Sequence, residues 1–307
     1  MNRVIFVLLS LVLVVATISL VTFFGTPSGF QTTFHLKQDK NTVLFAVSPW
    51  GDSKKMKEVY DPLLNFIGQK VGKKFQLLVM EDYDSAIEAI VEGDIDIFVL
   101  PPVSYVVARE REPNLQYIST QVREREGGSF ATYKGYLVAL KSRHAGWHLD
   151  DFLKRVKEFR LGFVTRKSSS GWAYPMAMMK KRGVDPHEIF REVIFFENHT
   201  LVTDAIASGE IDLGATWEYN LEQAREKHGD IFEIVEVTGK MPGIAWVAAK
   251  GVSSELIQKI REVQMVLNES PLKKELLKGT PDKGWMVLPE SDYDQVREVV
   301  KFVGTFE

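Results

Sequence analysis

Three consecutive serines followed by a glycine, Ser168-Ser169-Ser170-Gly171, stand between a short apolar run and a stretch with helical periodicity. Serine hydroxyls donate hydrogen bonds, and the first turn of a helix leaves its backbone N–H groups without intrahelical partners. Such a turn can surround a tetrahedral oxyanion with donors. The same residues would also suit a flexible loop with a serine N-cap, so the motif alone leaves both interpretations open.

Tyr83 and His199 form a second candidate pair, because they are 116 residues apart and each follows an apolar, strand-like run. The tyrosine can donate one hydrogen bond. The imidazole can donate one when neutral and adds a charge-assisted one when protonated. A loop histidine is commonly just solvated, so the argument rests on the matched positions. Tyr133 is a weaker candidate, since an ordinary packed hinge tyrosine would fit the same place.

The spacing of 116 residues recurs along the chain and predicts an internal duplication. It links strand-like runs to each other, and links two helix ends that each precede a glycine and a short strand. The matched segments are 43–48 with 160–164, 75–80 with 192–196, and 89–97 with 205–213. Gly93 and Gly209 stand where a left-handed helix C-cap is expected. The alternation of strands and helices predicts an α/β fold made of two similar β-α-β-α-β lobes.

Two further apolar runs, 135–141 and 243–250, follow the repeats and suit strands that cross between the lobes. They predict one lobe over 42–136 plus 243–307 and a second over 137–242. Ligands of open α/β sheets bind beyond the carboxyl ends of the strands, where helices begin. Two facing lobes would therefore enclose a cleft ringed by helix N-termini, which favours an anion.

Asp96 and Asp212 resemble a pair of catalytic acids, but both fall inside the repeated strand segments. We interpret them as structural carboxylates that cap neighbouring backbone.

The composition excludes several classes of protein. Lys and Arg number 38 against 41 Asp and Glu, whereas a nucleic-acid-binding protein needs a basic surface. The absence of cysteine excludes disulfides, thiolate catalysis and cysteine-ligated zinc. We expect no cofactor, no metal site and no nucleic-acid partner.

Residues 1–26 predict export. After Met1-Asn2-Arg3 comes an apolar run of 21 residues, 4–24, which suits the core of a signal peptide. The run is also long enough to cross a bilayer, and it lacks a clear small-residue cleavage site. A signal peptide and an uncleaved membrane anchor both stay open, followed by a polar tether over 27–41. The protein is expected in the periplasm or at the cell surface.

Over about residues 42–290 the chain resembles the phosphate/phosphite/phosphonate-binding proteins of ABC importers, which have the two-lobed type II periplasmic-binding fold. The resemblance rests on an ordered set of motifs. They are Ser48 after the first strand, Asp82-Tyr83, Pro102-Val103-Ser104-Tyr105, the serine turn Ser168–Gly171 with Pro175 beyond it, and His199 thirteen residues before Asp212.

The resemblance implies that Tyr83, Ser168, Ser169, Ser170 and His199 donate to the oxyanion. It also implies that Tyr133 lines the hinge side and that Ser48 belongs to the ligand-binding set.

The chain departs from the family at several wall positions. Ile244 follows Pro242-Gly243, where some members have a carboxylate for a substrate amine, and Glu218 is a possible substitute one residue out of place. Leu100 and Pro101 replace more polar residues. These departures favour a small or apolar-tailed ligand.

Together these features predict an extracytoplasmic solute-binding protein that captures phosphate, phosphite or an alkylphosphonate. It would act as a monomer and pass its ligand to an ABC permease or present it to a membrane sensor. An anchored sensory or scaffold protein with a diverged site is the alternative. A hydrolase is less favoured, because no nucleophile elbow, HExxH, P-loop or GxGxxG pattern occurs.

Overall fold

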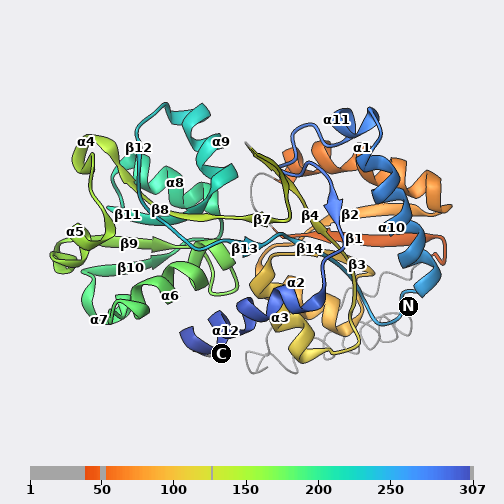
Figure 1. Cartoon of the computed structure of the whole chain (residues 1–307), viewed down its shortest axis with the longest axis horizontal. Helices are drawn as coiled ribbons and strands as arrows, with labels where there is room; N and C mark the ends of the chain where they lie inside the picture. The colour runs from red at the N-terminus through yellow and green to blue at the C-terminus, as the bar shows by residue number, and fades with distance from the viewer. Residues whose placement is uncertain (1–38, 49–52, 126, 305–307) are drawn as a thin grey trace, which may run out of the picture. The chain divides into compact units, whose positions relative to one another are not determined.

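The computed structural model describes residues 39–48, 53–125 and 127–304. They fall in one compact unit, Lys37–Glu307, which contains two separate large sheets (Figure 1). The predicted signal peptide or anchor and most of the predicted tether lie outside the described residues. Within the described ranges, no helix is long and apolar enough to cross a membrane.

The first sheet has the strand order β15-β4-β14-β3-β1-β2. β1 pairs in parallel with β2 and β3, whereas β14 runs antiparallel to both β3 and β4. Its strands are β1 (Thr42–Val47), β2 (Lys74–Val79), β3 (Ile97–Leu100), β4 (Gln116–Gln121), β14 (Ala245–Ala248) and β15 (Trp285–Met286). All residues of β3 and β14 are buried, so this pair forms the centre of the first core.

The second sheet has the order β10-β9-β11-β8-β12. β9 pairs in parallel with β10 and β11, and β8 runs antiparallel to β11 and β12. Its strands are β8 (Gly135–Leu140), β9 (Arg160–Phe163), β10 (Glu192–Phe195), β11 (Leu213–Trp217) and β12 (Phe232–Val237). The order β2-β1-β3-β14-β4 thus repeats as β10-β9-β11-β8-β12, with matching directions.

Short strand pairs and helices complete the unit. The pairs are β7 (Thr132–Tyr133) with β13 (Met241–Pro242), and β5 (Arg123–Arg125) with β6 (Gly128–Phe130). The helices near the first sheet in Figure 1 are α1 (Ser53–Val71), α2 (Tyr83–Glu92), α3 (Pro102–Arg111), α10 (Ser254–Asn268) and α11 (Leu272–Leu276). Those near the second sheet are α4 (Lys141–His144), α5 (Leu149–Leu153), α6 (Tyr174–Lys181), α7 (Pro186–Ile189), α8 (His199–Ser208) and α9 (Glu218–His228). The last helix, α12 (Asp294–Val303), contacts both α3 and α6, a helix near the second sheet.

The predicted glycine caps are confirmed. Gly93 ends α2 at φ 87° and Gly209 ends α8 at φ 76°, both left-handed conformations that glycine adopts without a steric penalty. The first residues of these helices are Tyr83 and His199, and their N-caps, Asp82 and Asn198, each accept a hydrogen bond from the backbone three residues on. The duplication therefore places both candidate donors, Tyr83 and His199, at the first residue of equivalent helices.

The structural interpretation of the two aspartates is also confirmed. Asp96 Oδ2 accepts a hydrogen bond from the Leu44 backbone N–H at 2.8 Å, and Asp212 Oδ2 accepts one from the Arg160 N–H at 2.9 Å. Each carboxylate thus satisfies a backbone donor within the first strand of its half. The exact limits of the lobes, 42–136 plus 243–307 and 137–242, stay a prediction.

Candidate functional site

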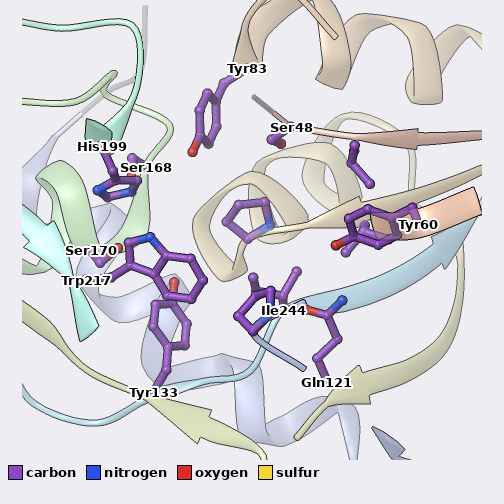
Figure 2. A pocket seen from close by; sticks show the side chains of 14 residues that line it. Ser48, Tyr60, Tyr83, Gln121, Tyr133, Ser168, Ser170, His199, Trp217 and Ile244 are labelled. Carbon is purple, nitrogen blue, oxygen red and sulfur yellow. The ribbon is translucent and has the colours of Figure 1, made fainter. Parts of the chain in front are cut away.

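A cavity of ≈ 530 Å³, including the space at its open mouth, lies beyond the strand ends of both sheets. It draws its walls from segments far apart in the chain (Figure 2). The residues that line it are Val47, Ser48, Tyr60, Tyr83, Val99, Pro101, Gln121, Tyr133, Ser168, Ser170, His199, Trp217, Ile244 and Pro281. Six of the eight predicted ligand-binding residues are thus brought together: Ser48, Tyr83, Tyr133, Ser168, Ser170 and His199.

The serine turn forms part of one side of the cavity. Ser168 caps a single π-helical turn, Ser169–Ala173, and its hydroxyl accepts a hydrogen bond from the Gly171 N–H at 3.1 Å. A side chain at Gly171 would come within 2.6 Å of Val164, so only glycine lets the turn pack this closely on the end of β9. Tight packing therefore holds the Ser168 hydroxyl at the cavity wall.

His199 lies beside this turn and is 3% exposed. Its Nε2 is 3.4 Å from the Ser168 hydroxyl, and its Nδ1 is 3.4 Å from the Thr216 hydroxyl. Burial lowers the pKa of His199 to about 3, because desolvation penalises the charged imidazolium. The ring is therefore neutral near pH 7 and can donate one hydrogen bond.

Two tyrosine hydroxyls, those of Tyr83 and Tyr133, also belong to the polar part of the wall. Burial raises the pKa of Tyr83 to about 12, an effect partly offset by a hydrogen bond with the Ser168 side chain. Burial likewise raises the pKa of Tyr133, with a hydrogen bond to the Ser169 side chain opposing it. Both phenols keep their protons at neutral pH and can donate hydrogen bonds to an anion.

Ser169 and Glu218 are not among the residues that line the cavity. The Ser169 hydroxyl accepts a hydrogen bond from the Val103 N–H at 2.9 Å, and the neighbouring Ser104 hydroxyl donates to the Lys167 carbonyl at 3.0 Å. Ser169 therefore ties the serine turn to the start of α3, which belongs to the other half of the fold. Glu218 begins α9, directly after the cavity residue Trp217.

The described residues of the cavity wall carry no formal charge. Among the described residues that line it there is no Asp, Glu, Lys or Arg. A positive side chain behind the wall, Arg123, lies 5.3 Å from the centre of the Trp217 ring and forms a buried ion pair with Asp282. An anion in this cavity would be held by neutral donors and by the helix starts at Tyr83 and His199.

Sequence reasoning missed three polar or aromatic wall residues: Tyr60, Gln121 and Trp217. Trp217 could have been found, because it follows Pro101 by 116 residues and the two lie at the ends of equivalent strands, Pro101 just after β3 and Trp217 as the last residue of β11. Its indole N–H donates to Asn220 Oδ1 at 2.6 Å, and its ring packs edge-on against Tyr133. Gln121 ends β4 and Tyr60 lies within α1, and neither belongs to a recognisable motif.

Comparison with known proteins agrees with this arrangement. The sequence pattern of the family described as "ABC transporter, phosphonate, periplasmic substrate-binding protein" matches residues 45–293. The phosphate-import protein PhnD of Mycolicibacterium smegmatis is 24% identical over 286 residues, which cover 86% of each chain.

Two solved structures share the fold. One is a binding protein component of an ABC phosphonate transporter from Pseudomonas aeruginosa, with a TM-score of 0.78 and 19% identity over 86% of this chain and 87% of that one. The other is PhnD1 from Prochlorococcus marinus in complex with methylphosphonate, with a TM-score of 0.75 and 18% identity over 85% and 97%. The family match covers most of the chain, which confirms the predicted two-lobed periplasmic-binding fold. The chain belongs to the family of periplasmic substrate-binding proteins of phosphonate ABC transporters.

Proposed function

We propose that the protein captures a small phosphorus oxyanion in this cavity, with Ser168, Ser170, His199, Tyr83 and Tyr133 as its donors and Ser48 beside them. The observation that carries the proposal is a buried set of neutral donors from both halves, around a wall whose described residues include no carboxylate. A carboxylate would repel the ligand, whereas hydroxyl, imidazole and backbone N–H groups form charge-assisted hydrogen bonds with it. The methylphosphonate complex of the related PhnD1 supports the same class of ligand.

Membership of the family places the protein in solute capture for an ABC importer. We further propose that a permease of that importer receives the ligand, that the protein acts as a monomer, and that residues 1–26 direct its export or anchor it. An anchored sensor or scaffold that has lost its ligand is the competing proposal, and it predicts that no phosphorus oxyanion binds.

The geometry favours binding over catalysis. Ser168 and His199 resemble a nucleophile and its base, but a general base works best with a pKa near the ambient pH, and burial lowers the pKa of His199 to about 3. The group at its other nitrogen is the Thr216 hydroxyl instead of an orienting carboxylate. We therefore propose that the protein is not an enzyme.

Titration calorimetry with phosphate, phosphite and methylphosphonate tests the proposal, with sulfate as a matched tetrahedral control. We expect at least one phosphorus ligand to bind more tightly than sulfate. At 100 times its Kd that ligand would stabilise the protein by about 2.7 kcal/mol, which is roughly 5–10 °C in Tm. If none of the three changes Tm or releases heat, the capture proposal fails and the scaffold alternative stands.

A further inference from the structure

The Gln121 side chain has a buried amide that faces the cavity. It is 1% exposed, and neither its Nε2 nor its Oε1 has a hydrogen-bond partner among the described residues. A buried polar atom without a partner costs roughly 1–3 kcal/mol. Gln121 lines the cavity, where a bound ligand can supply the missing partners. An amide that both donates and accepts suits a ligand group that does the same.

The backbone of Gln121 is held rigidly. Its N–H donates to the Ile244 carbonyl at 2.9 Å, and it pairs with Trp285 in the sheet register. Gly243 packs directly on the Gln121 carbonyl, so closely that a side chain at Gly243 would collide with it. A strand residue fixed on two sides presents its side chain in a preorganised position.

Gln121 lies across the cavity from the proposed oxyanion donors. In Figure 2, Gln121 and Tyr60 stand on one side, and His199, Ser168 and Ser170 stand on the other. Five of the other wall residues are apolar, namely Val47, Val99, Pro101, Ile244 and Pro281, and the rest are Ser48, Tyr83, Tyr133 and Trp217. A ligand with its oxyanion at the serine turn would direct any substituent past these apolar residues toward Gln121.

The charge of the wall restricts that substituent. An ammonium group would be buried without a carboxylate, and a carboxylate group would be buried without a cation, since no charged residue of the described chain lines the cavity. Arg123 does not line the cavity: it lies behind the wall, in an ion pair with Asp282 and against the Trp217 ring. A short, neutral, hydrogen-bonding tail fits both the apolar wall and the glutamine amide.

Building on the proposed function, we propose that Gln121 forms a tail subsite that selects phosphonates with a short neutral polar substituent, such as a hydroxyalkyl group. The phosphonate group binds at the serine turn and the tail hydroxyl binds the Gln121 amide. Aminoalkyl and carboxyalkyl phosphonates are disfavoured, because the subsite offers their charges no partner.

The test compares the Kd values of hydroxymethylphosphonate, methylphosphonate, 2-aminoethylphosphonate and phosphonoacetate by calorimetry. The native protein should bind the hydroxymethyl ligand most tightly of the four. Gln121→Leu should reduce its preference for hydroxymethyl- over methylphosphonate roughly tenfold, because one or two hydrogen bonds to the tail are lost. Gln264→Leu is the matched control: Gln264 is equally buried and its amide also lacks partners among the described residues, but it lies on α10 and does not line the cavity. That variant should keep the native preference.

A second variant, Gln121→Glu, tests the subsite even if Gln121→Leu fails to fold. Gln121→Glu should shift the preference toward 2-aminoethylphosphonate roughly tenfold, because it supplies the missing carboxylate. An unchanged preference in both Gln121 variants would overturn the tail subsite. Equal losses for methyl- and hydroxymethylphosphonate would also overturn it, since Gln121 would then contact the oxyanion. If the native protein binds none of the ligands, the failure lies with the proposed function.

Discussion

The two halves of the fold agree in their framework and differ in their ligand-facing residues. Asp96 and Asp212 make the same kind of hydrogen bond to a backbone N–H within their first strands, at 2.8 and 2.9 Å. Gly93 and Gly209 end the matching helices in the same left-handed conformation. At the first residue of those helices, however, one half has Tyr83 and the other has His199. Positions that satisfy backbone groups are held alike, whereas positions that face the cavity are free to differ.

The residues that directly follow the first strand of each half also differ. In the first half, Ser48 follows β1, and its hydroxyl has no partner among the described residues. In the second half, β9 leads into the serine turn. Its hydroxyls form hydrogen bonds with the backbone of the turn, with His199 and with the first turn of α3. We infer that, among the described residues, the second half supplies most of the donors proposed for the oxyanion. The first half supplies Gln121 and the apolar residues of the wall around the proposed tail subsite.

The largest expected effect comes from removing a donor of the serine turn. Ser168→Ala should weaken binding of the preferred phosphorus ligand roughly 10- to 150-fold, because a hydrogen bond to a charged group contributes about 1.5–3 kcal/mol. Calorimetry measures the loss, and Ser254→Ala, at an exposed position on α10, should leave the Kd unchanged. If Ser168→Ala binds the ligand as tightly as the native protein, the Ser168 hydroxyl is not part of the site. The second half would then not supply most of the donors.

The matched aspartates should give the next largest effect, on stability. Asp96→Ala and Asp212→Ala each leave the backbone N–H of a first-strand residue unpaired, which should lower the free energy of unfolding by about 2 kcal/mol. Urea titration measures both, with Glu110→Ala on the exposed face of α3 as a control that changes it by about 0.5 kcal/mol or less. If only one of the two substitutions lowers the free energy of unfolding, the two equivalent hydrogen bonds do not stabilise their halves equally.

Features that recur at the spacing of 116 residues could be predicted from the sequence. The strands, the glycine caps and the role of Asp96 and Asp212 all depend on local patterns that appear twice. Gln121 could not be predicted, because its position at the wall depends on β4 pairing with β14 and β15, which are over 100 residues away in the chain. Only the folded sheet brings them together.

The serine turn shows a second limit of sequence reasoning. All three hydroxyls are predicted to face the ligand; the structure adds that they belong to a single π-helical turn and that the Ser169 hydroxyl accepts a hydrogen bond from the Val103 N–H. Local residue types predicted a turn rich in donors. They could not predict which hydroxyl would face the cavity and which would join the two halves.

The smallest expected effect concerns the pair Tyr83 and His199. We expect neither side chain to change its protonation state near neutral pH. Burial raises the pKa of Tyr83 to about 12 and lowers that of His199 to about 3, so both are neutral donors between pH 5 and 8. The imidazole resonances of His199, assigned by comparison with His199→Gln, should not shift over that range in the ligand-free protein.

Stability should nevertheless depend on this residue, because the pKa of His199 is lower in the folded than in the unfolded chain, where it is near 6.5. Its contribution is fully present above pH 6.5 and is lost as the pH falls toward 3, by at most about 1.4 kcal/mol per pH unit. The stability difference between native protein and His199→Gln should therefore move against the native protein between pH 7.5 and 5.5. A ring that titrates near pH 6.5 would mean that the second half presents a cation where the first presents a phenol. The two helix starts would then differ in charge as well as in residue type.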